Sequence, residues 1–260
     1  MREAIINFSR RLLYFLREIG FDPTRLVSAL QTLPFYLVDL FWFKQKYNSK
    51  IPIVFSPSLN DKRMTAGTAT GHYFWQDIIC AHWVKNDVHR THLDLGSRID
   101  GFITHISIFC NVELLDIRPL VSEIPNVSFK VRDILKANEE MLKKFHTVSS
   151  LHSIEHFGLG RYGDPLVVNG HEIGLLNLAD YVEAGGFLYV SFPIGKPRVE
   201  FNSQRVLSPD WPVLLLQNFQ LIEFVLIPWK GAPIHGLTPD KVDKNRFGQA
   251  GLYKFKKISN

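Results

Sequence analysis

The stretch from His92 to Gly101, HLDLGSRIDG, holds the clearest arrangement of groups that could bind a ligand. A short apolar segment ends at Asp94 and turns through Gly96, and about 20 residues further on a second apolar run ends at Asp116. This order of strand, glycine turn, helix, strand and acid is typical of the nucleotide-binding end of a doubly wound α/β sheet. Backbone groups at the turn can face a polar ligand, and the later carboxylate can accept hydrogen bonds from ribose hydroxyls.

Each of these acids also has a structural interpretation, because a carboxylate at a strand end can cap the turn or helix that follows. Their separation and context favour a ligand role. Asp133, which follows a third apolar run, could reach an adenine ring. The residues predicted to bind a cofactor are Asp94, Gly96, Ser97, Arg98, Gly101, Asp116 and Asp133.

The stretch from Glu155 to Pro165, EHFGLGRYGDP, is the second group of reactive side chains. Its three glycines predict a shaped loop at the carboxyl edge of the sheet, where open α/β sheets bind their ligands. His156 is a candidate general base, because the ordinary histidine pKa of about 6.5 lets it take a proton at neutral pH. Asp164 is predicted to orient His156 and Arg161 to bind a charged substrate, and Glu155 completes the predicted catalytic set. The alternative is a structural loop held by its own hydrogen bonds.

Residues 152–156, HSIEH, also fit the H-x-x-E-H pattern of inverted zincins. A zinc site of that kind needs both histidines on one helical face and a further ligand. The apolar run Val148–Leu151 is typical of a strand and places His152 at a strand end, so no metal is predicted. The residues predicted to bind substrate at the same mouth are His72, Tyr73, His152, Asn202 and Arg205, with a packing role as the alternative for the first two.

Apolar runs and glycine-containing turns predict the elements that position these groups. Strands are expected at His92–Leu95, Val112–Leu115, Val127–Val131, Thr147–Leu151, Phe187–Phe192, Leu221–Ile227 and Gly251–Lys257. Helices are expected at Tyr73–Val84, Phe102–Phe109, Asn138–Lys144 and Leu175–Val182. This alternation indicates an α/β, Rossmann-like domain with a mostly parallel sheet and helices on both faces. It is expected to cover residues 48–260, after an N-terminal helical extension over residues 1–47.

The extension has the pattern of apolar and amphipathic helices. Apolar residues recur on one stripe through residues 1–20, and Pro23 opens a second helix that Pro34 is expected to break. The most apolar run, Leu33–Phe43, is too short to span a bilayer. We expect residues 1–43 to contact a membrane surface or a membrane-bound partner. The alternative is that they pack on the Rossmann-like domain as a lid or form a contact in a homo-oligomer.

Composition narrows the partners. The chain has 260 residues, a formal net charge of +5 and a sequence pI near 9.1, and its basic residues are mostly dispersed. Nucleic acid is not expected as a partner, because its binding requires a denser basic patch or a known module. An anionic, phosphate-bearing small molecule or glycan, or an anionic membrane surface, suits the charge better. Two distant cysteines fit a reducing cytosol, so the expected location is cytoplasmic, peripheral at the inner face of the membrane.

Ser150–His156 follows the fourth expected strand and Glu183–Pro193 leads into the fifth. With the acid after the second strand, these segments resemble class I S-adenosylmethionine-dependent methyltransferases. A narrower set of segments comprises Gly71–Phe74, Leu95–Gly101, Leu115–Leu120, Glu155–Pro165 and Phe201–Val206. These resemble the methyltransferase-like family called domain of unknown function two-sixty-eight.

The resemblance implies a class I methyltransferase-like fold, S-adenosylmethionine as cofactor, and methyl transfer to a polar acceptor. The implied acceptor is a glycan or glycolipid precursor in surface-polysaccharide assembly. In that role Asp116 would hold the ribose, and Asp94 and Gly96 would shape the methionine end of the site. His156 would deprotonate the acceptor hydroxyl, and alignment of the reactants would supply much of the rate.

The first turn departs from the methyltransferase pattern, because Arg98 and Asp100 stand between its two glycines. Arg98 could clamp a carboxylate or a phosphate, or it could fill the space that the cofactor needs. Two alternatives therefore stay open. One is another transferase or a hydrolase that binds an anionic sugar phosphate through Arg98 and Arg161. The other is a non-catalytic scaffold of a glycan-assembly complex that uses the same fold.

Overall fold

The computed structural model of the chain describes residues 12–62, 67, 69–136 and 144–259. The chain divides into two compact units, residues 1–68 and residues 69–260. Residues 48–68, which the sequence assigned to the α/β domain, thus group with the N-terminal extension.

The N-terminal unit contains the helix α2, Pro23–Lys46. Its start is as expected, since the Asp22 side chain accepts hydrogen bonds from the backbone N–H groups of Thr24 (3.0 Å) and Arg25 (3.3 Å). Pro34 lies inside the helix, so the predicted break at this residue is wrong. A proline removes one backbone hydrogen bond, and the helical residues on either side outweigh that loss.

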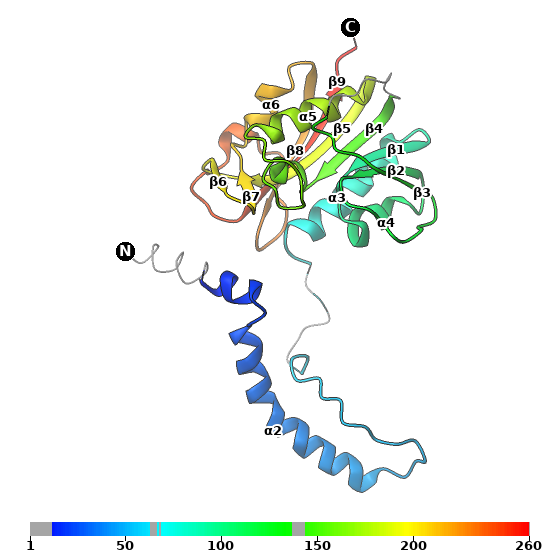
Figure 1. Ribbon diagram of the computed structural model, residues 1–260, viewed down its shortest axis with the longest axis vertical. Helices are drawn as coiled ribbons and strands as arrows, with labels where there is room; N and C mark the ends of the chain where they lie inside the picture. The colour runs from blue at the N-terminus through cyan, green and yellow to red at the C-terminus, as the bar shows by residue number, and fades with distance from the viewer. Residues whose placement is uncertain (1–11, 63–66, 68, 137–143, 260) are drawn as a thin grey trace. The chain divides into compact units, whose positions relative to one another are not determined.

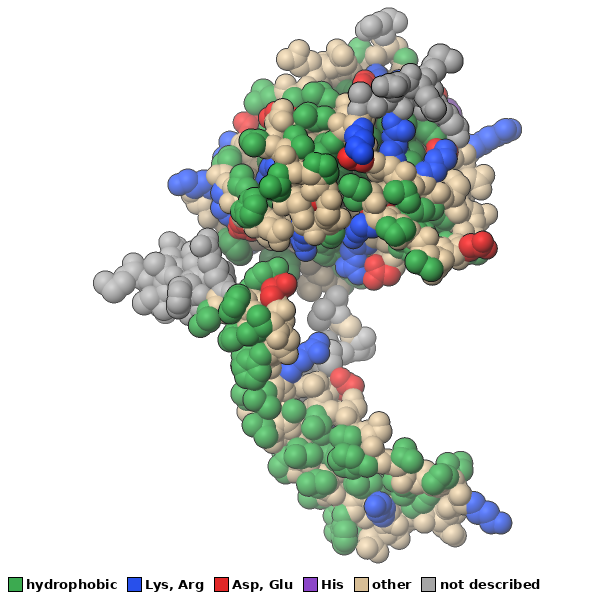
Figure 2. All heavy atoms as spheres, in the orientation of Figure 1, with side chains coloured by type: hydrophobic (Ala, Val, Ile, Leu, Met, Phe, Trp, Pro, Cys, Tyr) green, Lys and Arg blue, Asp and Glu red, His purple; other side chains and the backbone are tan. Residues whose placement is uncertain are grey.

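Many apolar side chains of α2 are exposed, and Figure 2 shows hydrophobic side chains along the visible face of this helix. Its exposed large hydrophobic side chains are Leu26, Val27, Leu30, Phe35, Leu37, Val38, Phe41, Trp42 and Phe43. By length and composition alone, α2 could cross a membrane: its most apolar window has a mean hydropathy of 1.4 and is 6% buried. Of the helix predicted over residues 1–20, residues 12–18 are helical, and residues 1–11 lie outside the described part of the chain.

The second unit is built on a seven-stranded sheet (Figure 1). Its strands are β1 (Thr91–Leu95), β2 (Asn111–Asp116), β3 (Val127–Val131), β4 (Phe145–Leu151), β5 (Val182–Ile194), β8 (Phe219–Pro228) and β9 (Gln249–Lys257). They lie in the order β3-β2-β1-β4-β5-β9-β8. The first five run parallel, and β9 is antiparallel to both β5 and β8. All seven predicted strands are therefore confirmed.

Helices cover both faces of this sheet, which explains why its central strands are buried runs rather than alternating ones. On one face, α3 (His72–Asp87) and α4 (Thr104–Ile106) pack against the sheet through side chains such as Cys80, Val84 and Ile106. On the other face, α5 (Gly170–Asp180) packs through Leu175 and Leu178. The predicted helices at Tyr73–Val84 and Leu175–Val182 correspond to α3 and α5, and α5 begins earlier than expected.

The segment after β1 differs most from expectation. A π-helix, η1 (Ile99–Ile103), leads into the short α4, so the helix predicted at Phe102–Phe109 begins earlier and ends at Ile106. Tertiary packing sets this conformation: a Cβ on Gly101 would lie 2.2 Å from Oδ2 of Asp77, so the π-turn sits directly on α3. The helix predicted at Asn138–Lys144 falls mainly on residues 137–143, outside the described residues.

Three short elements and two 3-10 turns were not expected. The turn η2 (Ile154–His156) follows β4. Between β5 and β8 lie a hairpin, β6 (Arg198–Glu200) with β7 (Gln204–Val206), and the helix α6 (Trp211–Leu215), and between β8 and β9 lies the turn η3 (Pro239–Lys241). Elements of three to five residues are too short to show a hydrophobic period.

Candidate functional site

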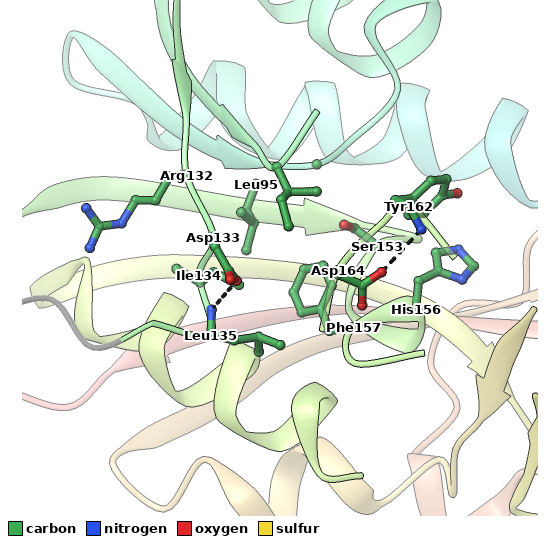
Figure 3. Close-up of a pocket in the computed structure, with 12 residues that line it drawn as sticks. Leu95, Arg132, Asp133, Ile134, Leu135, Ser153, His156, Phe157, Tyr162 and Asp164 are labelled. Carbon is green, nitrogen blue, oxygen red and sulfur yellow. Dashed lines mark hydrogen bonds between the residues drawn. The ribbon is translucent and has the colours of Figure 1, made fainter. Parts of the chain in front are cut away.

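A small hollow lies where the carboxyl ends of the parallel strands meet (Figure 3). The loops after four strands line it: Gly96 follows β1, Ile117 follows β2, residues 132–135 follow β3, and residues from Ser153 to Asp164 follow β4. Open α/β sheets bind ligands at this edge. The two predicted groups of reactive residues are thus brought to one place.

Asp94 stabilises the turn after β1 through hydrogen bonds. Its side chain is fully buried and accepts hydrogen bonds from the backbone N–H of Ser97 (3.0 Å) and its hydroxyl (2.7 Å), and a further one from the hydroxyl of Ser149. Burial raises the pKa of Asp94 to about 6, although these hydrogen bonds act in the opposite direction. Asp94 and Ser97 are absent from the lining of the hollow and hold the turn in shape.

Gly96 is required where it stands. Its φ of +69° is in the left-handed region, and a Cβ there would lie 2.3 Å from Oγ of Ser153. Gly96 lines the hollow, whereas Arg98 and Gly101 do not. Arg98 instead forms an ion pair with Asp100 (2.7 Å) and lies 4.8 Å from the centre of the Tyr73 ring.

Asp116 lies at the end of β2, where a ribose-binding acid is expected, and it already has a partner. Arg118 donates to both carboxylate oxygens through its guanidinium group (3.0 and 2.7 Å) and to one of them through its backbone N–H (2.8 Å). The same guanidinium lies 4.3 Å from the centre of the Tyr162 ring. The side chain of Asp116 is 15% exposed and that of Arg118 49%, so the outer partner is the more accessible one.

Asp133 marks the far side of the hollow. Its Oδ1 accepts a hydrogen bond from the backbone N–H of Leu135 (3.0 Å), drawn as a dashed line in Figure 3. Ile117, Ile134 and Leu135 lie in the same lining and give this side an apolar wall. An apolar wall with one polar edge is suited to a flat heterocyclic ring.

His156 has a defined tautomer. Its Nδ1 lies 2.7 Å from the carbonyl oxygen of Ser203, which can only accept, so Nδ1 carries the proton and Nε2 has the free electron pair. Arg161 Nη1 donates to the same carbonyl (3.0 Å), and its longer approach of 3.4 Å to Nδ1 joins two donors. Burial lowers the pKa of His156, which opposes the attraction of Glu155. The residue is therefore neutral at neutral pH and able to accept a proton at Nε2.

Glu155 lies between two histidines and is fully buried. Its Oε1 is 2.9 Å from Nδ1 of His152 and 3.8 Å from Nε2 of His156. Burial on its own raises the pKa of Glu155, but electrostatic attraction to His152 and His156 and the His152 hydrogen bond lower it overall. Oε2 of Glu155 and Nε2 of His152 have no hydrogen-bond partner among the described residues, and His152 has a φ of +50°. Strain and unsatisfied polar atoms of this kind cluster at functional sites.

Two residues at the start of α3 complete this group. The ring of His72 stacks on that of His152 at 5.4 Å, and the ring of Tyr73 lies 5.1 Å from it. Burial lowers the pKa of His72 to about 4. The predicted substrate residues His72, Tyr73 and His152 are thus in contact with one another.

Three other predicted residues have structural roles. The carboxylate of Asp164 accepts the backbone N–H groups of Gly158 (2.7 Å) and Tyr162 (3.2 Å), so the prediction that it orients His156 is wrong. The Ser203 carbonyl has that role.

Arg205 is buried, and its guanidinium donates to the carbonyl oxygens of Phe157 (2.6 Å) and Val168 (3.0 Å). It therefore ties down the loop after β4 and does not line the mouth, contrary to expectation. Asn202 is exposed, with a φ of +62°, in the turn between β6 and β7 that presents Ser203. The role of a backbone carbonyl such as that of Ser203 cannot be predicted from a sequence. The pairing of Arg118 with Asp116, two residues before it, could have been predicted from the sequence and was not.

Comparisons with known proteins agree with this geometry. The model of a family described as "Caenorhabditis protein of unknown function, DUF268" matches residues 115–226, which confirms the resemblance over that part of the chain. The comparison with curated proteins gives no match.

Among solved structures, the chain is similar to the 1,6-didemethyltoxoflavin-N1-methyltransferase of Burkholderia thailandensis, with 12% identity and a TM-score of 0.50 over 71% of this chain and 77% of that one. It is also similar to the N-methyltransferase NodS of Bradyrhizobium japonicum WM9, with 12% identity and a TM-score of 0.47 over 72% and 88%. The strand order and the similarity to the Burkholderia thailandensis enzyme show that the second unit has the Rossmann-like fold of class I S-adenosylmethionine-dependent methyltransferases.

Proposed function

We propose that the chain is an S-adenosylmethionine-dependent methyltransferase and that its acceptor is a hydroxyl group of a glycan or glycolipid precursor. The observation that carries the proposal is the hollow lined by Gly96, Asp133 and His156, with Oδ2 of Asp116 3.9 Å from where a Cβ on Gly96 would lie. The Burkholderia thailandensis enzyme of the same fold was crystallised with S-adenosylhomocysteine, the demethylated form of this cofactor.

The residues around the hollow fit the cofactor. Ile117, Ile134 and Leu135 supply an apolar wall for the adenine ring, and Asp133 supplies a polar edge. Asp116 would release Arg118 and accept hydrogen bonds from the ribose hydroxyls in its place. That exchange costs little, because an ion pair with a half-exposed arginine contributes about 0–1 kcal/mol.

When bound, S-adenosylmethionine supplies an electrophilic methyl group. As its C–S bond to the methyl group breaks, it would leave as S-adenosylhomocysteine, and His156 would accept at Nε2 the proton that the methylated hydroxyl gives up. The carboxylate of Glu155, 3.8 Å from Nε2, stabilises the imidazolium ion that results. The guanidinium groups of Arg118 and Arg161, 4.3 and 5.2 Å from the centre of the Tyr162 ring, suit a phosphate-bearing acceptor.

Calorimetric titration with S-adenosylhomocysteine tests the cofactor site. We expect one equivalent to bind, and Asp116→Ala to weaken binding at least tenfold, or about 1.4 kcal/mol. Glu113→Ala is the matched control. Glu113 is on the same strand, its side chain is 14% exposed where that of Asp116 is 15% exposed, and it forms an ion pair with Lys130. It stands in the middle of β2, away from the carboxyl end where Asp116 lies. No heat and no melting shift at millimolar ligand would overturn the proposal.

The Arg118–Asp116 pair favours one second candidate, a transferase or hydrolase that acts on an anionic sugar phosphate. If Asp116 keeps Arg118, the ribose site stays closed while Arg118 and Arg161 remain able to bind an anion. A sugar phosphate that raises the melting temperature of the parent but not of Arg161→Ala, while S-adenosylhomocysteine does nothing, would favour this candidate.

For α2 we propose contact with the anionic inner face of a membrane. Exposed apolar side chains cover the helix, and basic residues flank it: Arg17 and Arg25 at one end, Lys44 and Lys46 at the other. Each basic residue near an anionic surface adds about 1 kcal/mol of attraction. Asp39, in the second half of the helix, forms an ion pair with Lys62 (2.7 Å), which favours a position among the headgroups over a crossing of the bilayer.

Co-sedimentation with vesicles of phosphatidylcholine and phosphatidylglycerol tests this contact. We expect the full chain to pellet at low salt and the double variant Leu30→Glu, Phe41→Glu to stay in the supernatant. The control is Ile108→Glu, Val168→Glu, which changes two exposed apolar residues of the second unit. A parent that stays in the supernatant as a dimer, which the helix variant makes monomeric, would identify α2 as a homo-oligomer contact instead.

A further inference from the structure

The edge of the sheet opposite the hollow holds a second cluster of chemically active side chains. His89 precedes β1, His146 is the second residue of β4, and Glu183 is the second residue of β5. Since these strands run parallel and β1, β4 and β5 are neighbours, their starts lie at one edge. One ligand atom from each of the three side chains lies within 4.8 Å of the other two.

Two of the three groups, His146 and Glu183, are brought together by a side-chain contact and by the pairing of their strands. The imidazole Nδ1 of His146 lies 2.6 Å from Oε1 of Glu183. The pairing of β4 with β5 shifts register at this point, from Phe145 opposite Val182 to Thr147 opposite Phe187. The extra residues form a bulge, and bulges re-aim side chains. Gly186 is required in it, since a Cβ there would lie 2.7 Å from the carbonyl oxygen of His146.

The third group, His89, is exposed and lies flat on His146. The ring centres are 3.6 Å apart, with 15° between the planes. A metal ion can bind one ring nitrogen of each histidine together with a carboxylate oxygen of Glu183.

We propose that His89, His146 and Glu183 bind a divalent transition-metal ion, with zinc as the natural occupant. Two imidazoles and a carboxylate are a known zinc donor set, with metal–ligand distances of about 2.0–2.2 Å. Ligand atoms that now lie within 4.8 Å reach those distances through a rotation of the exposed His89 side chain. The sequence analysis predicted no metal at residues 152–156. Those residues lie at the other edge of the sheet, so that prediction does not concern this cluster.

This ion would join the segment before β1 to the starts of β4 and β5. With three protein ligands its coordination shell keeps an open position for water or for a group from another molecule. The site is independent of the hollow and of the proposed methyl transfer, because no residue belongs to both.

The test uses the full chain, freed of any histidine tag and washed with chelator. Calorimetry with zinc and the visible absorption of bound cobalt measure binding. We expect one equivalent of either metal and a rise in melting temperature with zinc. Both signals should be lost in His89→Ala, which changes an exposed residue and keeps the fold, and in Glu183→Gln, which keeps the shape of the side chain.

Two further variants make the result decisive. His105→Ala, another exposed histidine, should bind both metals as the parent does. His152→Ala should also bind them, since His152 lies at the carboxyl edge. Binding that is lost in His152→Ala and kept in His89→Ala, or a parent that binds neither metal, would overturn the proposal.

Discussion

The turn after β1 and the loop after β4 lie at the same edge of the sheet, but they differ in how far their buried polar groups are hydrogen-bonded. In the turn, Asp94 accepts hydrogen bonds from Ser97 and Ser149. Gly96 packs closely against the side chain of Ser153. In the loop, Glu155 and His152 each keep a buried polar atom without a partner among the described residues.

This difference separates support from chemistry. A satisfied buried network gives rigidity, whereas unsatisfied atoms and a strained backbone persist where a function needs them. We therefore propose that the turn after β1 acts as a scaffold and that the reactive groups come from the loop after β4 and the start of α3. Changes in the first region should alter stability, and changes in the second should alter proton affinity and turnover.

The largest effect is expected for Asp94→Ala. The substitution removes three hydrogen bonds and leaves the buried backbone N–H and hydroxyl of Ser97 without their acceptor, so the free energy of unfolding should fall by about 3 kcal/mol. Urea denaturation measures it. Asp100→Ala, in the same turn but 74% exposed at its side chain, should change stability by less than about 0.5 kcal/mol. Equal losses in the two variants would contradict a scaffold role that is specific to Asp94.

Asp94 should also make stability depend on pH. Burial raises its folded pKa from 3.8 to about 6, so the folded state holds this proton more tightly than the unfolded state does. The stability that it contributes is therefore present below about pH 4 and lost as the pH rises to about 6. In Asp94→Asn this dependence disappears. Denaturation at several pH values should show the parent losing stability relative to the variant between these limits, and parallel curves would refute the assignment.

A smaller effect on stability, but a clear one on proton affinity, is expected for Glu155→Gln. The amide keeps the shape of the side chain and removes a buried charge, so stability should change by less than about 1.5 kcal/mol. The attraction of Glu155 raises the pKa of His156 against the effect of burial, so this pKa should fall further in the variant. NMR titration of the imidazole signals measures it. A loss of stability as large as that of Asp94→Ala would place Glu155 in the scaffold instead.

The sequence predicted the sheet well because buried parallel strands are long apolar runs that end at turns. It also predicted that the acid-ended strands and the loop from Glu155 to Pro165 meet at one edge, since parallel topology requires it. It could not predict which polar groups those residues contact. Asp164 and Arg205 look reactive by type, but tertiary packing gives them backbone partners.

The orienting group of His156 was beyond prediction for a different reason. It is the backbone carbonyl of Ser203, and the short hairpin that presents it has no periodic signal. Pro34 shows the converse limit: a local rule predicted a break in a helix that continues through it.

The central claim is that an adenosyl ligand binds between the turn at Gly96 and Asp116. The most direct test is a crystal structure of the full chain grown with S-adenosylhomocysteine. We predict electron density for the ribose beside Asp116, with the guanidinium of Arg118 moved away from the carboxylate that it now binds at 2.7 Å. An Arg118–Asp116 pair that stays intact, with no density in the hollow at saturating ligand, would contradict the account.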